Sequence, residues 1–105
     1  MKRSAVVDKI ARTMHENHPD AETFLYGSEA RGDARPDSDF DILVLLNLEN
    51  EAFRAQKKAV ANSLLDVEIE TGSDISTYIV PRAWWENQPF VTPFYSNVVR
   101  DGIRL

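Results

Sequence analysis

The sequence contains no cysteine, only four glycines in 105 residues, and no long hydrophobic run. The absence of cysteine excludes both a disulfide framework and a cysteine-ligated zinc site. The basic start is followed by an apolar run that Asp8 and Lys9 interrupt at once, so it does not read as a signal peptide. No segment is long enough to cross a membrane. We therefore expect a cytoplasmic protein without a membrane partner.

Basic residues are outnumbered by acidic ones. The sequence has 12 Lys and Arg against 17 Asp and Glu, which gives a formal net charge of -5. Nonspecific binding to nucleic acid depends on a basic face, so nucleic acid is not an expected partner. The length suits one domain over residues 1–105. A domain this small leaves much of its surface exposed, which is compatible with a homodimer or a hetero-oligomer.

The hydrophobic pattern alternates between the periods of helices and strands. The expected elements, in chain order, are a helix at 3–17, strands at 23–26 and 39–46, a helix at 47–70, a strand at 74–80 and two short helices before Gly102. This order predicts an α/β (α+β) fold with a small mixed β-sheet flanked by helices.

The stretch LYGSEARGDARPDSDFDILV (residues 25–44) places two aspartates at the start of an apolar strand. Side chains alternate along a strand, so Asp39 and Asp41 point to one face, roughly 6–7 Å apart. Two carboxylates at this distance repel each other, and a cation between them removes the repulsion. Magnesium suits such a pair because it binds few protein carboxylates and keeps waters. The alternative is that both aspartates are simply solvated at the strand start.

Gly27 and Ser28 follow the preceding strand. A glycine there allows a sharp turn and a close approach to a ligand, and the amides that follow it can donate to phosphate oxygens. A Gly-Ser pair alone is an ordinary turn. If the two strands are neighbours, however, their connection starts and ends at the same rim of the sheet. Phosphate donors and a metal-binding carboxylate pair then converge on one site.

These residues resemble the signature of the nucleotidyltransferase superfamily that includes DNA polymerase beta. The fuller GSEARGDARPDSDFDILV is similar to the minimal nucleotidyltransferase (MNT) branch, which typically reads G-S-x-A-R-G-x-A-x-x-x-S-D-x-D-L. The resemblance implies the polymerase beta-like nucleotidyltransferase fold and ATP as substrate. It implies that Gly27 and Ser28 hold the triphosphate, that Arg31 lies near the phosphates, and that Asp39 and Asp41 bind two Mg²⁺ ions.

Members of the family also use a third carboxylate on a later strand, as a metal ligand and possible base. The best candidate by this resemblance is Asp74, at the start of the strand at 74–80. Three other acids compete with it, but they are expected on a helix end or its exit: Asp66, Glu68 and Glu70.

In the MNT branch, the partner is often a helical HEPN protein, and the two form a toxin–antitoxin module. The resemblance thus implies an antitoxin that transfers AMP from ATP to a tyrosine of a HEPN toxin (AMPylation). One alternative is a catalytically idle MNT-like antitoxin that acts by binding its partner. Another is an enzyme that modifies a small molecule, of the aminoglycoside type.

Two further residue pairs have structural interpretations. His15 and His18 stand at the end of a predicted helix and before a proline, where we expect both to be solvated. Of the adjacent Trp84 and Trp85, we expect one to lie in the core.

Overall fold

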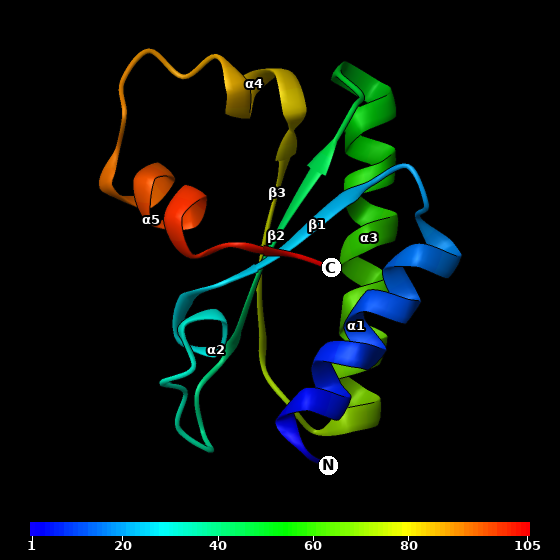
Figure 1. Cartoon of the computed structure of the whole chain (residues 1–105). Helices are drawn as coiled ribbons and strands as arrows, with labels where there is room; N and C mark the ends of the chain where they lie inside the picture. The colour runs from blue at the N-terminus through cyan, green and yellow to red at the C-terminus, as the bar shows by residue number, and fades with distance from the viewer.

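The computed structural model describes residues 1–105 and forms a mixed α/β domain (Figure 1). The elements, in chain order, are α1 (Arg3–Asn17), β1 (Glu22–Tyr26), α2 (Gly27–Arg31), β2 (Phe40–Leu46), α3 (Asn50–Thr71), β3 (Ile75–Pro81), α4 (Arg82–Glu86), α5 (Pro93–Asp101) and β4 (Ile103–Arg104). No helix is both long and apolar enough to cross a membrane. The predicted fold class is confirmed, with element ends that differ by a few residues.

The sheet has the strand order β3-β2-β1-β4. β1 lies antiparallel to both β2 and β4, whereas β2 lies parallel to β3. The strand β4 was not predicted, because a two-residue segment carries no periodicity. It is held at the sheet edge by pairing with β1, and the Leu105 amide adds a 2.8 Å hydrogen bond to the Thr23 carbonyl.

The central strand β2 is buried on both faces of the sheet, which explains its uninterrupted apolar sequence. Ile42 and Val44 pack on one face against α1 and α3, and Leu43 packs on the other with Trp85 of α4 and Val98 of α5. Figure 1 shows these helix pairs on opposite sides of the sheet. As predicted, one of the two adjacent tryptophans is in the core.

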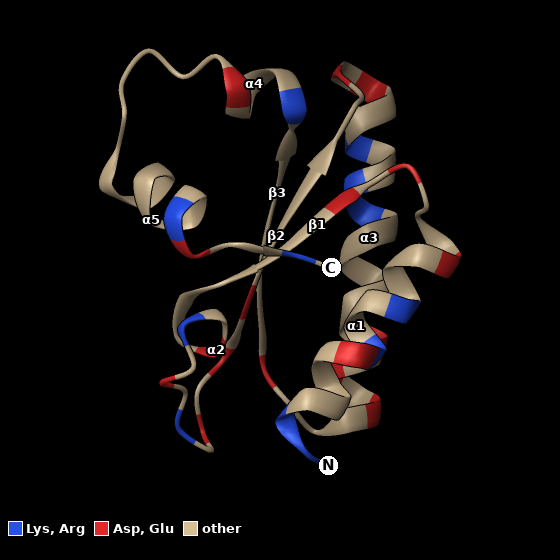
Figure 2. Ribbon diagram, in the orientation of Figure 1, with Lys and Arg blue, Asp and Glu red and all other residues tan.

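Charged residues of both signs lie along the connection between α2 and β2 (Figure 2). This connection, residues 32–39, follows α2 and returns to the end of the sheet where β1 ends and β2 begins. Its polar composition agrees with its exposed position, while the strand that follows it is apolar.

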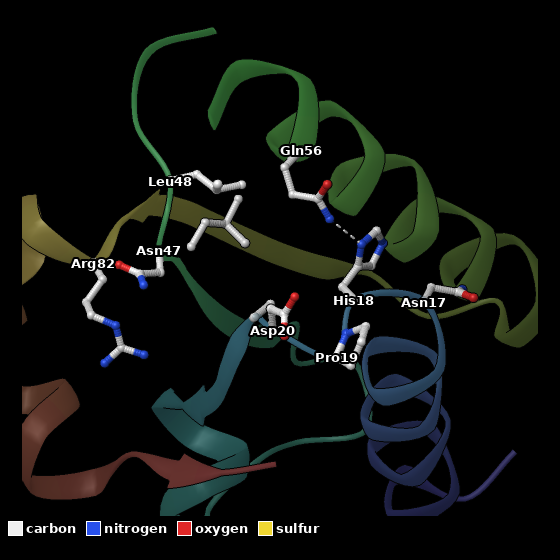
Figure 3. Close-up of a pocket in the computed structure, with 10 residues that line it drawn as sticks. Asn17, His18, Pro19, Asp20, Asn47, Leu48, Gln56 and Arg82 are labelled. Atoms are coloured by element: carbon white, nitrogen blue, oxygen red, sulfur yellow. Dashed lines mark hydrogen bonds between the residues drawn. The ribbon is translucent and has the colours of Figure 1, made fainter. Parts of the chain in front are cut away.

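His18 at the end of α1 is buried, with 7% of its surface exposed, so the prediction of a solvated side chain was wrong. Its Nδ1 lies 2.7 Å from Nε2 of Gln56, as Figure 3 shows. An amide nitrogen can only donate, so Nδ1 accepts and Nε2 carries the proton, which it donates to Oγ of Ser63 at 2.9 Å. Both partners come from α3, so nothing close to His18 in the sequence predicts its burial.

Burial lowers the pKa of His18 below its ordinary value of 6.5, because the charged ring would lose its hydration. As the pH falls below about 6.5, the unfolded chain takes up a proton at this residue before the folded chain does. The His18 contribution to stability is therefore present above that pH and is lost as the pH falls through the folded-state pKa.

We predict that His18→Gln makes the free energy of unfolding less dependent on pH between about pH 7 and 5. The variant should also lose about 1–3 kcal/mol at neutral pH, because Gln56 and Ser63 lose their buried partner. Chemical denaturation at several pH values measures both effects. Replacement of the exposed His15 by Gln is the control, and an equal pH slope for His18→Gln and wild type would contradict the prediction.

Candidate active site

The two predicted halves of the site meet at one end of the sheet, where β1 ends and β2 begins. Tyr26, the last residue of β1, is the register partner of Asp41 on β2. Because α2 begins at the next residue, Gly27 and Ser28 lie beside the strand that carries the aspartates. The expected juxtaposition of the Gly-Ser turn with the Asp-Phe-Asp segment is therefore present in the backbone.

Gly27 is in contact with the carboxylate of Asp41. Its φ of +72° lies in the left-handed region, which residues other than glycine rarely adopt. A methyl group on its Cα would overlap Oδ2 of Asp41 and would lie 3.0 Å from Cγ. Glycine is thus required here twice, once for the turn and once for the approach of the carboxylate.

The surroundings of Asp41 disfavour the charged form of its carboxylate. Its pKa is raised mainly by burial and further by the charge of Asp39, while Arg31 acts in the opposite direction. Asp39 itself is exposed. A divalent cation between the two carboxylates would offset both the burial cost and the repulsion, and oxygen donors are the ligands that magnesium prefers. The residues present therefore fit a magnesium ion.

An open cavity of about 340 Å³ lies beside the Gly-Ser turn and Asp41, whereas Asp39 does not line it. Its wall combines α2, the end of β1, the start of β2 and one side of α5; the lining residues are Tyr26, Gly27, Ser28, Arg31, Asp41, Phe94, Asn97 and Asp101. Four of these were not singled out from the sequence. Tyr26 directly precedes Gly27 and could have been found by proximity, whereas the three residues of α5 are distant in sequence and carry no recognisable motif.

The floor of this cavity is aromatic on one side and charged on the other. The Phe94 ring meets the ring of Tyr26 edge to face at a centroid distance of 5.4 Å, and that of Tyr78 at 5.5 Å. Arg31 lies between two acids, with Nε 3.4 Å from Asp33 and Nη1 3.9 Å from Asp101. These long contacts leave the guanidinium available to a phosphate group.

The main chain of Asp74 lies next to the segment that carries Asp39 and Asp41. Its carbonyl accepts a 3.0 Å hydrogen bond from the amide of Phe40, the residue between the two aspartates. Its side chain is exposed, and no group of three or more His, Cys, Asp or Glu side chains lies close enough to hold a metal ion. The β3 residue in register with Asp41 is Ser76. The role of Asp74 as third carboxylate thus stays a prediction.

The competing acids lie on α3, which covers the opposite face of the sheet from Asp41. Glu68 accepts a 3.0 Å hydrogen bond from the amide of Ile75, and Glu70 forms an ion pair with Lys9. Asp66 is exposed. Two of the three therefore have structural partners of their own.

A larger cavity, of about 510 Å³, lies at the other end of the sheet (Figure 3). It is bordered by His18 and Gln56 on one side and by Asn47 and Arg82 on the other. Arg82 pairs with Glu22, and His18 has both ring nitrogens occupied. This cavity is remote from the aspartates, so volume alone does not identify the site.

A Gly-Ser turn in contact with the carboxylate of Asp41 at the end of a mixed sheet, with Asp39 two residues before it, suits a protein that binds phosphate groups and a metal ion. The family model described as nucleotidyltransferase domain matches residues 7–96. The chain belongs to the nucleotidyltransferase domain family, and the resemblance stated above is confirmed. No curated protein gives a significant match.

Solved structures show the same fold. A candidate nucleotidyltransferase from Sulfolobus solfataricus is 17% identical with a TM-score of 0.59, over 95% of this chain and 76% of that one. A toxin–antitoxin complex with AMP-PNP is 24% identical with a TM-score of 0.50, over 92% and 69%. A mutant of the MntA-HpeT toxin–antitoxin complex is 25% identical with a TM-score of 0.51, over 94% and 70%.

We predict that Gly27→Ala weakens the binding of Mg-ATP at least about tenfold, because the methyl group displaces the Asp41 carboxylate. Gly32→Ala is the matched control, since Gly32 also has a positive φ of +82° but open space around its Cα. Both variants should lose about 1–3 kcal/mol through backbone strain, and only Gly27→Ala should lose the ligand. Titration with a fluorescent ATP analogue and thermal unfolding separate the two effects.

Asp74→Asn is expected to lower the rate of nucleotidyl transfer about 100-fold, as loss of a metal ligand or base would. Asp66→Asn, at an exposed position of α3, is the control and should retain the wild-type rate. Initial rates at saturating Mg-ATP measure the effect. Equal rates for the two variants would exclude Asp74 from the reaction.

Proposed function

We propose that the protein is a magnesium-dependent nucleotidyltransferase that transfers AMP from ATP to a tyrosine of a HEPN-type toxin, and so acts as an antitoxin. The observation that carries this proposal is the contact between Gly27 and the carboxylate of Asp41. It joins the candidate phosphate-binding turn to the candidate metal-binding pair. Membership of the nucleotidyltransferase domain family supports nucleotidyl transfer as the reaction class. The magnesium, the tyrosine acceptor and the HEPN partner belong to the proposal.

In this mechanism Asp39 and Asp41 hold magnesium, with two ions proposed. When bound, the metal neutralises phosphate charge and lowers the pKa of the attacking hydroxyl. The raised pKa of Asp41 would then fall, because a nearby cation favours the charged carboxylate. The bound ion would thus offset the repulsion between the two carboxylates that hold it.

The other residues of the site bind and orient. The backbone amides that follow Gly27 donate to phosphate oxygens, and Arg31 contributes positive charge from α2. The acceptor oxygen attacks the α-phosphorus, its proton passes to a carboxylate of the site, and the bond to pyrophosphate breaks. The protein needs no covalent nucleophile, since alignment and charge neutralisation provide the catalysis.

A protein acceptor agrees with the surface of the molecule. The net charge of -5 disfavours nucleic acid. Exposed apolar side chains gather on α4 and the segment after it, where Trp84 is 50%, Phe90 78% and Val91 76% exposed. Such residues are typical of protein interfaces. The likeness to the MntA-HpeT toxin–antitoxin complex supports the same kind of partner.

The second candidate function is neutralisation of the toxin by binding alone. One observation favours it, namely that no third carboxylate is gathered with Asp39 and Asp41. In this case the nucleotide site would be idle, and the apolar surface on α4 and beyond would carry the activity.

The test is incubation with α-labelled ATP, Mg²⁺ and the co-purified partner. We expect label on the partner from the wild type and a loss of at least about 100-fold in Asp39→Asn/Asp41→Asn, because the metal ligands are removed. Asp20→Asn, at an exposed position away from the site, should label normally.

The two functions predict different results for neutralisation of the toxin in cells. If transfer is the function, the double variant binds the partner but no longer neutralises it. If the wild type transfers no label and the double variant still neutralises the toxin, the binding function is correct and the enzymatic one is wrong.

A further inference from the structure

Arg3, the first residue of α1, makes four contacts with the segment that carries the candidate site. Its Nε lies 2.7 Å from Oε2 of Glu29. Nη1 donates to the carbonyl of Pro36 at 3.2 Å, and Nη2 donates to the carbonyl of Ser38 at 2.9 Å. The guanidinium carbon lies 4.1 Å above the ring centroid of Phe40. One side chain thus contacts α2, the connection and the start of β2.

Three of these four partners are sequence neighbours of a candidate site residue. Glu29 follows Ser28 on α2. Ser38 precedes Asp39, and Phe40 follows it. The guanidinium therefore joins the phosphate-binding turn to the metal-binding segment from behind, without lining the cavity itself.

The connection at residues 32–39 has few other anchors. Its backbone and side-chain hydrogen bonds are otherwise local: the amides of Gly32 and Asp33 bond to carbonyls of α2, and Arg35 and Ser38 bond to each other. The only hydrogen bonds that tie it to a distant element come from Arg3. Loss of this side chain would leave the part of the connection beyond Asp33 without a hydrogen bond to a distant element.

The position of Arg3 is not explained by helix formation. A cation in the first turn of a helix is unfavourable, because the amino end carries partial positive charge. The side chain is only 25% exposed, and its partner Glu29 only 15%. Tertiary contacts therefore account for the arginine at this place.

The chemistry also requires arginine and not only a positive charge. The planar guanidinium can donate to three acceptors at its edge and stack on Phe40 with its face. The ammonium of lysine has no planar face and cannot span three fixed acceptors. A lysine at this position would keep the charge opposite Glu29 and lose the link to the connection.

We infer that Arg3 is a positioning residue that holds the Gly27-Ser28 turn and the Asp39–Asp41 segment in one fixed arrangement. Its effect on catalysis rests on the proposed function above. Its effect on the motion of residues 28–39 does not, so the two can be tested separately.

The experiment compares Arg3→Ala and Arg3→Lys with wild type by amide hydrogen exchange, with Arg12→Ala, an exposed position of the same helix, as control. We expect exchange of the amides in residues 28–39 to accelerate about tenfold in both Arg3 variants, while β2 and α3 stay protected. At saturating Mg-ATP, kcat should fall about tenfold or more in both, because the two halves of the site lose their alignment. Arg12→Ala should match wild type in both measurements.

The outcomes are distinct. Unchanged exchange in residues 28–39, or an equal increase throughout β2 and α3, would overturn the positioning role. Wild-type exchange and wild-type kcat in Arg3→Lys would show that the positive charge alone suffices. They would overturn the requirement for a planar guanidinium. If the wild type proves inactive, the proposed function fails while the exchange result still decides the role of Arg3. Faster exchange with unchanged kcat in an active enzyme would limit Arg3 to a structural role and overturn the catalytic part.

Discussion

The contact between the Gly27 backbone and the Asp41 carboxylate is the constraint on which the site depends. It exists because β1 and β2 pair antiparallel with Tyr26 opposite Asp41, which places the turn after β1 beside the carboxylate. Only a residue without a side chain allows this approach. The pairing of the strands therefore sets the geometry of the site, and the buried apolar residues of β2 secure that pairing from both faces.

The electrostatics follow from this placement. Asp41 lies against the turn and is partly buried, which raises its pKa, and Asp39, the residue before β2, adds like charge. The nearby Arg31 gives partial compensation, since Asp33 and Asp101 also compete for it. Burial of Asp41 and its repulsion by Asp39 thus destabilise the folded chain, and a bound cation would remove this destabilisation. Such local cost, balanced by a well-packed core elsewhere, is common at functional sites.

Much of this arrangement could be predicted from local sequence. The continuous apolar run identifies β2, and the polar connection between the two strands must return to its starting rim, which brings the Gly-Ser turn beside Asp41. What could not be predicted depends on partners far along the chain. His18 is buried because Gln56 and Ser63 on α3 satisfy its ring. The wall formed by α5 and the two-residue strand β4 likewise arise only from tertiary packing.

Asp74 shows how the main chain can fix a residue beside the site while its side chain stays exposed. Its main chain is fixed, because its carbonyl accepts from Phe40 and the following amide of Ile75 donates to Glu68. The residue precedes Ile75, which pairs with Phe40, so its backbone lies level with Asp39. Its side chain is exposed, and a change of rotamer costs little at an exposed position. A cation held by Asp39 and Asp41 would supply the attraction that such a rotation needs.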